Sequence, residues 1–319
     1  MKKSRTVRIV LCIVIGVLLA RIAMSFCAVG LFYRFFYARY DTLCPTDLKV
    51  SDLSEPAVPV AFDAGDSTLS GYLIGDGQNG VIVIAHGMRS GMDAHFAEAD
   101  YFAAHGYTVL VFDGTGTRTS GGDSRRSVSY ARDDLDAALD WLETGEYSDL
   151  PVFLYGHSSG GYAAATALAR SDAAVAVCAF DDPVDTMCDT ARQYVGFLVL
   201  PQRRFLSVWN RIRAGSDANE LASDCINATD VPILIVGASA DTVIPDSDSL
   251  YLRAGAIDDP NAAYLLREGD HSDVWLSPDA LAYRTEMQNA APEAVDRGRY
   301  NAVDPAFLDE VLAFFASAQ

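Results

Sequence analysis

The stretch VFLYGHSSGGYAAAT, residues 152–166, decides the fold of this chain. Its first four residues form an apolar run typical of a buried strand, and its last residues are small ones typical of a closely packed helix. Between them lies the pattern Gly-x-Ser-x-Gly, centred on Ser158. The glycines let backbone and helix approach each other at a sharp turn, so we predict a strand, turn and helix that expose the Ser158 hydroxyl.

Seven further runs have the β-rich composition of strands, at residues 58–62, 69–74, 81–85, 108–112, 174–180, 233–237 and 262–266. Several are continuously apolar, as strands buried on both faces must be. Helical periodicity falls between them, at residues 94–105, 128–144, 161–170 and 305–316. We therefore predict an α/β fold with a mostly parallel sheet of eight strands and helices on both faces.

One segment interrupts this alternation of strands and helices. Residues 181–230 contain no obvious strand, and we interpret them as a short helical cap inserted after the sixth strand. The predicted domains are an N-terminal anchor over residues 1–40 and a single large domain over residues 41–319. The net charge of −19 opposes attraction to phosphate backbones, so a nucleic-acid partner is not expected.

A serine hydroxyl is a poor nucleophile unless a neighbouring base takes its proton and an acid orients that base. We assign the base to His271, which directly follows the last predicted strand. The other histidines lie in the turn itself, in the turn after the third strand, or on or at the end of a predicted surface helix: His157, His86, His95 and His105.

Asp241 follows the seventh predicted strand and is our candidate for the orienting acid. The order Ser158, Asp241, His271 is the order that this topology uses. The alternatives are Asp181 or Asp182 after the sixth strand. Asp270, adjacent in sequence to His271, is badly placed to orient it and is interpreted as a solvated loop charge.

Acyl transfer also requires amide donors that face the developing oxyanion. We expect one from the backbone N–H of Ser159 and one from Met88, in the glycine-containing turn HGMRSG at residues 86–91. No Cys-x-x-Cys pair is present, so the sequence offers no metal-binding spacing of that kind. Of the six cysteines, Cys178 and Cys188 are the nearest pair for a disulfide in an exported domain, and the alternative is separate buried thiols.

The N-terminus has the features of a membrane anchor. A basic cluster within residues 2–8 precedes an apolar run over residues 9–20, and the apolar character resumes after Arg21 and continues through Tyr33. Together these runs can cross a bilayer, with Arg21 near the middle, and the basic cluster favours a catalytic domain outside the cytoplasm. The alternative is a signal peptide cleaved near residues 23–25, which would release a secreted domain.

Two further segments carry a family resemblance. Residues 105–122 read HGYTVLVFDGTGTRTSGG and residues 241–245 read DTVIP. With these and the turn at Ser158, the chain resembles the α/β-hydrolase superfamily from about residue 58 onward, especially its monoacylglycerol-lipase-like and serine-aminopeptidase-like branch. Where that branch often has Arg-Gly-x-Gly-x-Ser, this chain has DGTGTR at residues 113–118, which leaves the substrate open.

The resemblance implies hydrolysis through an acyl-enzyme on Ser158, with no metal or organic cofactor. Our first hypothesis is a carboxylic ester hydrolase acting on a small-molecule acyl ester. The second is an amide or peptide hydrolase with the same residues, and the third is a non-catalytic, membrane-anchored binding protein. The sequence does not indicate an oligomeric state.

Overall fold

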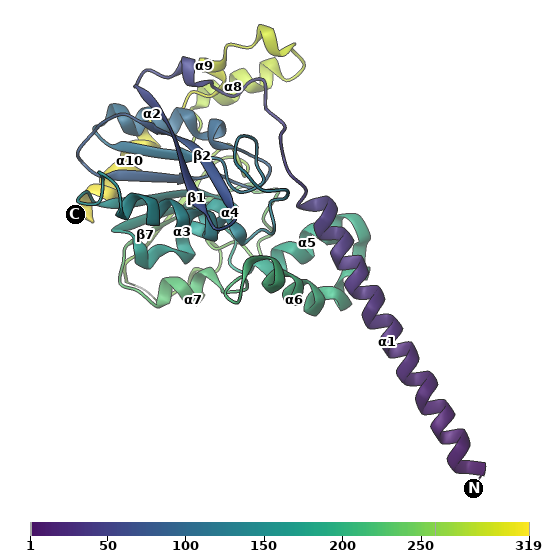
Figure 1. Cartoon of the computed structure of the whole chain (residues 1–319). Coiled ribbons are helices and arrows are strands. Elements are labelled where there is room, and N and C mark those ends of the chain that lie inside the picture. The colour runs from purple at the N-terminus through teal and green to yellow at the C-terminus, as the bar shows by residue number, and fades with distance from the viewer. Residues whose placement is uncertain (1, 259, 319) are drawn as a thin grey trace.

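A mixed sheet forms the centre of the computed structural model, which describes residues 2–258 and 260–318 (Figure 1). Its strand order is β1-β2-β4-β3-β5-β6-β7-β8, and only the β1–β2 and β2–β4 pairs are antiparallel. This confirms the predicted sheet of eight mostly parallel strands. The strands are β1 (Ala57–Ala64), β2 (Ser67–Ile74), β3 (Val81–Ala85), β4 (Thr108–Phe112), β5 (Val152–His157), β6 (Ala173–Val177), β7 (Ile233–Ala238) and β8 (Ala262–Arg267).

The central strands are buried on both faces because helices cover each side of the sheet. In β3, Val81 and Val83 pack in one core, which also contains side chains of α3 (Tyr130–Glu143) and α4 (Ser159–Thr166). Ile82 and Ile84 point the other way, into a core shared with α2 (Phe96–Ala104) and α10 (Pro305–Ser317). Successive side chains of a strand alternate between faces, which explains the continuous apolar runs.

Helices without any strand fill most of the segment between β6 and β7 in the part of the chain that the structure describes. They are α5 (Pro183–Val195), the 3-10 turn η4 (Gly196–Gln202), α6 (Arg203–Ala214) and α7 (Ala222–Asn227). β6 itself ends at Val177, three residues earlier than predicted, because Cys178 adopts a left-handed conformation with φ of 48°. The region that we interpreted as a cap is therefore helical.

Two helices near the C-terminus were not predicted. They are α8 (Pro278–Met287) and the short α9 (Arg297–Tyr300). The side chain of Ser277 accepts a hydrogen bond from Ala280 N, and Pro278 occupies the first turn of α8. This pairing of a capping serine with an N-terminal proline is the sequence signal that could have revealed the helix.

The N-terminal segment is one continuous helix, α1 (Lys2–Phe36), that projects away from the domain beside α5 and α6 (Figure 1). Residues Val7–Phe36 are long and apolar enough to cross a membrane. The helix is exposed from Val7 to Met24, but Val29, Tyr33 and Phe36 are buried against the domain. The apolar segment therefore has two parts with different surroundings.

Candidate active site

Ser158 lies at the turn between β5 and α4, at the carboxyl edge of the sheet. Its backbone adopts φ 56° and ψ −115°, a strained conformation for a residue other than glycine. A Cβ at Gly156 would lie 2.1 Å from the carbonyl oxygen of Gly160, and a Cβ at Gly160 would lie 2.0 Å from that of Ala85. Only glycine therefore fits at either end of this turn, which holds the Ser158 hydroxyl at a helix N-terminus.

His271 and Asp241 meet in the loops that follow β8 and β7. Nδ1 of His271 lies 2.9 Å from Oδ2 of Asp241, and the other oxygen of Asp241 accepts the N–H groups of Val243 and Ile244, each at 2.8 Å. Because a carboxylate only accepts, Nδ1 carries the hydrogen and Nε2 is left with a lone pair. The Ser158 hydroxyl makes no hydrogen bond within the described residues. A hydrogen bond between a nucleophile and its base is often long in the free protein and shortens only when substrate binds.

Asp270 and His157 brace the loop that carries His271. Asp270 accepts the N–H of His271 at 2.7 Å and that of Thr242 at 2.8 Å, so one carboxylate joins the two loops of the acid and the base. We had interpreted it only as a solvated charge. The ring of His157 donates from Nε2 to the His271 carbonyl at 2.9 Å, and burial lowers the His157 pKa well below its usual value, which keeps that ring neutral.

The turn after β3 lies directly against the nucleophile. A Cβ at Gly87 would be 3.2 Å from the Cβ of Ser158. The N–H of Met88, the next residue, has no partner within the described residues and is free to donate. Ser159 opens α4 directly after the nucleophile. The structure thus brings both predicted amide donors to the side of Ser158.

His86 fixes this turn to the loop after β4. Its Nε2 accepts the N–H of Gly114 at 3.0 Å, so the hydrogen is on Nδ1, which donates to the carbonyl of Gly87 at 2.7 Å. Burial lowers the His86 pKa and favours this neutral form.

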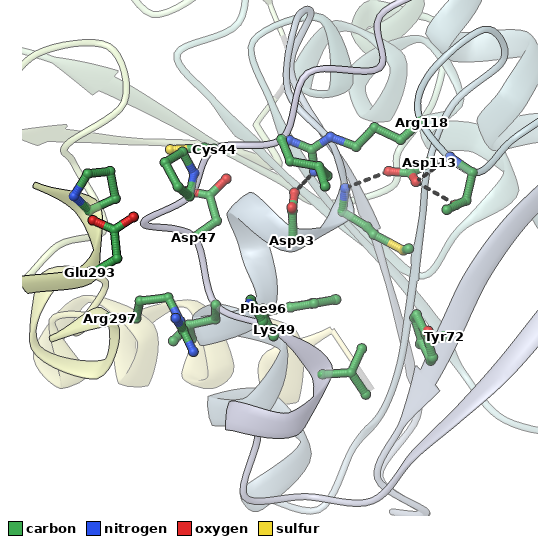
Figure 2. Close-up of a pocket in the computed structure, with 17 residues that line it drawn as sticks. Cys44, Asp47, Lys49, Tyr72, Asp93, Phe96, Asp113, Arg118, Glu293 and Arg297 are labelled. Carbon is green, nitrogen blue, oxygen red and sulfur yellow. Dashed lines mark hydrogen bonds and ion pairs between the residues drawn. The ribbon is translucent and has the colours of Figure 1, made fainter. Parts of the chain in front are cut away.

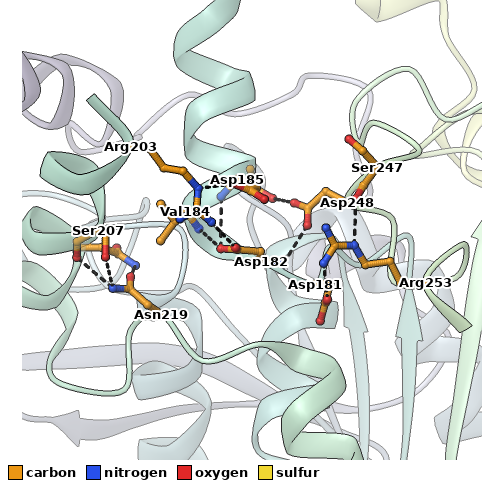
Figure 3. A network of polar contacts seen from close by, with 12 residues as sticks. Asp181, Asp182, Val184, Asp185, Arg203, Ser207, Asn219, Ser247, Asp248 and Arg253 are labelled. Carbon is orange, nitrogen blue, oxygen red and sulfur yellow. Dashed lines mark hydrogen bonds and ion pairs between the residues drawn. The ribbon is translucent and has the colours of Figure 1, made fainter. Parts of the chain in front are cut away.

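The two alternative acids are engaged elsewhere, in the network of Figure 3. Asp181 accepts the N–H of Ser223 and the guanidinium of Arg253, both at 2.8 Å. Asp182 begins α5 by accepting the N–H of Val184 at 2.7 Å, and it pairs with Arg203 at 2.8 Å. Neither carboxylate bonds to His271, so Asp241 is the one of the three that can orient it.

His95 is a correction to the sequence interpretation, which placed it on a surface helix. Its side chain is only 1% exposed, and its Nδ1 lies 2.8 Å from a carboxylate oxygen of the buried Glu98. Its ring packs near those of His157 and Trp275, with centroids 5.7 and 5.4 Å away. His95 is therefore an interior side chain, packed against His157 and Trp275.

A small cavity of about 50 Å³ adjoins Ser158. Its walls come from the turn after β3, from α5 of the cap and from the loop after Asp241, and most are apolar. Among the described residues that line it, Asp189 is the one acidic side chain. A cavity of this size holds only a few water molecules, so it fits a short acyl group better than a long chain.

A much larger cavity lies elsewhere in the described residues. It has a volume of about 610 Å³ and is lined by the linker after α1, by α2 and by the loops after β3 and β4 (Figure 2). Arg118 and Asp93 form an ion pair in its wall, and Asp113 accepts the N–H of Met92. None of the three candidate catalytic side chains lines it, so this cavity is separate from the candidate site.

A thiol also approaches the acid and the base. Ligand atoms of Cys178, Asp241 and His271 all lie within 4.8 Å of one another. Burial raises the Cys178 pKa well above its usual value, so the thiol is protonated, and both oxygens of Asp241 already accept hydrogen bonds. This donor set does not suit a metal ion. All six cysteines are free thiols, and Cys178 and Cys188 are separately buried.

Several known proteins are similar in sequence to parts of this chain. A family model described as serine aminopeptidase, S33, matches residues 76–198. The uncharacterized protein YfhR of Escherichia coli K12 is 26% identical over 242 residues, which cover 72% of this chain and 79% of YfhR. The phospholipase YtpA of Bacillus subtilis is 37% identical over 86 residues, which cover 26% of this chain and 32% of YtpA.

Solved structures give the same picture of the fold. The Pyrococcus furiosus esterase Pf2001 superposes with a TM-score of 0.60 at 17% identity, covering 88% of this chain and 98% of the esterase. At this identity the likeness concerns the fold alone. The chain thus shares its fold with this structure over most of its length.

Proposed function

We propose that this chain is a serine hydrolase of the α/β-hydrolase superfamily that cleaves carboxylic esters through an acyl-enzyme on Ser158. One observation carries the proposal. Ser158 occupies the strained turn after β5, and in the loops after β7 and β8, at the same edge of the sheet, Nδ1 of His271 is already held by Asp241 at 2.9 Å. A buried pair of this kind has the geometry of a general base with its orienting acid.

The proposed reaction uses only side chains and amides of this chain. Ser158 Oγ attacks the ester carbonyl while Nε2 of His271 takes its proton, and the N–H groups of Met88 and Ser159 bind the oxyanion. Collapse of the tetrahedral intermediate expels the alcohol, which takes the proton from His271 and leaves an acyl group on Ser158. Water, deprotonated by His271, then attacks this ester. The second tetrahedral intermediate collapses to the acid, and the departing Ser158 oxygen takes the proton back from His271.

An ester substrate with a short acyl group is the preferred class. The cavity at Ser158 is about 50 Å³ and mostly apolar, and the relatives include an esterase and a phospholipase by name. We further propose that α1 anchors the chain in a membrane with the domain on its outer side. The alternative is cleavage of the helix as a signal peptide.

A second candidate is an amide or peptide hydrolase with the same residues. Asp189 on α5 lines the cavity and could pair with a free amino terminus, and the matching family model is described as a serine aminopeptidase. Asp189 already pairs with Arg192 at 3.0 Å, however, so an amine substrate would have to displace that arginine.

The test compares wild type with Ser158→Ala on p-nitrophenyl esters and on aminoacyl-coumarin amides. We expect ester turnover, its loss by at least about 1,000-fold in Ser158→Ala, and fluorophosphonate labelling of the wild type alone. Ser317→Ala, which removes an exposed hydroxyl on α10, serves as the matched control. Cleavage of amides but not esters would establish the second candidate. Absence of both turnover and labelling would favour the non-catalytic binding protein.

A further inference from the structure

The anchor helix α1 and the cap form one packed unit. Phe26 of α1 lies against Phe205 of α6, with ring centroids 5.3 Å apart. A Cβ at Gly30 would approach the ring of Trp209 to 3.2 Å, so the helices are in direct contact there. Any membrane that holds α1 therefore lies close to the cap.

The part of α1 that is free to contact lipid has the length of one bilayer crossing. Every residue from Val7 to Met24 is exposed, and burial begins at Ser25. Eighteen helical residues extend about 27 Å, close to the ~30 Å of a hydrocarbon core. On this placement Arg21 lies near one end of the crossing rather than at its middle, where a long basic side chain can reach the headgroups.

The cap segment next to this boundary has an unusual charge. Residues 192–214 contain five arginines and no aspartate or glutamate, in a chain with 43 acidic and 24 basic side chains. Arg204 and Arg211 are exposed and form no ion pair within the described residues. A local basic surface on an acidic protein favours an anionic partner.

The same segment exposes large apolar side chains. Phe197 is 77% exposed and Tyr194 is 65% exposed, and the Tyr194 ring contacts Phe36 of α1 at 6.3 Å between centroids. On α6, Val208 and Ile212 are exposed one turn apart beside Arg204 and Arg211. We call this set the cap face: Arg192, Tyr194, Val195, Phe197, Arg203, Arg204, Val208, Arg211 and Ile212.

We propose that the cap face rests on the surface of an anionic lipid bilayer, with Phe197 and Tyr194 among the headgroups and with Arg204 and Arg211 on lipid phosphates. Aromatic and apolar side chains bordered by arginine are the composition of interfacial membrane-binding helices. Continuity with α1 selects a bilayer over a soluble partner. α5 carries both cap-face residues and walls of the Ser158 cavity, so docking brings that cavity to the bilayer. The proposal rests on the proposed anchorage by α1 and on no catalytic step.

The experiment uses the full chain in phosphatidylcholine vesicles with and without phosphatidylglycerol. Tryptophan is introduced by Phe197→Trp, and the added fluorescence is quenched with lipids brominated close to the headgroup. Leu252→Trp is the matched control, since Leu252 is 55% exposed but lies outside the cap. We expect quenching of Phe197→Trp, stronger in anionic vesicles, and little quenching of Leu252→Trp.

The role of the positive charges at Arg204 and Arg211 is tested by adding Arg204→Glu and Arg211→Glu to Phe197→Trp. The matched control adds Arg204→Lys and Arg211→Lys instead, which keeps both charges. The Glu pair should reduce quenching in anionic vesicles and lower turnover of a bilayer-dispersed ester roughly ten-fold, while a water-soluble ester is cleaved as before. The Lys pair should behave as wild type.

Equal quenching at positions 197 and 252, with the chain still resistant to alkaline extraction, would overturn the proposal. A shielded, unquenched position 197 in a dimeric chain would also overturn it and make the cap face an interface between copies. Quenching requires no turnover and should persist in Ser158→Ala. Failure of the hydrolase proposal is therefore distinguishable from failure of this one.

Discussion

The loops after β6 and β7 each place an aspartate whose carboxylate is held in the same way. Oδ1 of Asp182 accepts the N–H groups two and three residues ahead at 2.7 and 3.2 Å, and Oδ1 of Asp241 does the same at 2.8 and 2.8 Å. The two differ at Oδ2, which faces Arg203 in one loop and His271 in the other. The two carboxylates thus accept the same pair of backbone N–H groups but differ in the side chain that faces Oδ2. Arg203 ties Asp182 to the cap, and His271 gives Asp241 its candidate chemical role.

The variant Asp241→Asn tests most directly whether Asp241 orients His271, and it should have the largest effect. The amide oxygen can still accept the N–H groups of Val243 and Ile244, but the side chain no longer fixes the His271 tautomer. We expect kcat for an ester to fall roughly 1,000- to 10,000-fold with little change in thermal stability. Steady-state kinetics and thermal melting check this, with the exposed Asp246→Asn as control. A loss under about ten-fold would remove Asp241 from the proposed role.

Asp270→Ala tests the hydrogen bonds that join the loop of Asp241 to the loop of His271. It removes hydrogen bonds to His271 and Thr242 but no proposed catalytic group. We expect kcat to fall about ten-fold, because the loop that carries His271 loses its fixed position. The conservative Asp270→Asn should recover part of the rate. If both variants match wild type, Asp270 has no positioning role.

Asp248, which ties the loop after β7 to the cap, should make stability depend on pH. It accepts the N–H of Asp182 at 2.9 Å and contacts Thr186, and burial raises its pKa to about 7 (Figure 3). An unfolded aspartate titrates near 4, so the folded state holds this proton more tightly. The resulting stabilisation is complete below about pH 4 and is lost as pH rises to about 7.

Asp248→Asn should therefore remove part of this decline in the free energy of unfolding, on the order of 1–3 kcal/mol. Asp134, whose pKa burial also raises to about 7, supplies a further part of the slope. Urea unfolding at pH 4.5 and 7.5 measures the difference. An unchanged slope in the variant would contradict the assignment.

The smallest effect is expected for Asp182→Asn. It keeps the bonds that begin α5 and loses only the charge facing Arg203, whose side chain is 51% exposed. We expect a loss of at most about 1 kcal/mol in the free energy of unfolding and a kcat within about two-fold of wild type. If Asp182→Asn loses most of its kcat while Asp241→Asn stays active, Asp182 and not Asp241 has the orienting role.

The sequence predicted the sheet and the turn at Ser158 because their signals are local. Each strand is indicated by its own short apolar run. The turn at Ser158 is indicated by an apolar run, two glycines and a serine within fifteen residues. The pairing of Asp241 with His271 was predicted from chain order, and the structure brings those two side chains together at 2.9 Å. Their catalytic roles stay a prediction until the variants are measured.

The errors concern contacts that local sequence does not encode. His95 looked exposed on helical spacing, but Trp275, far along the chain, covers it. Asp270 looked solvated because its partner Thr242 comes from another loop. The second half of α1 looked like membrane-facing surface, since an apolar stripe does not distinguish lipid from the Trp209 ring that covers it.

The continuity of α1 has one further consequence. A flexible tether would let an anchored domain reach a range of heights above a membrane. Under the proposed anchorage, a single helix packed into the cap would hold Ser158 at one height. Such an enzyme would cleave only those ester bonds that lie at the height of Ser158 above the bilayer. Insertion of a flexible glycine and serine segment after Met24 would free it from that level.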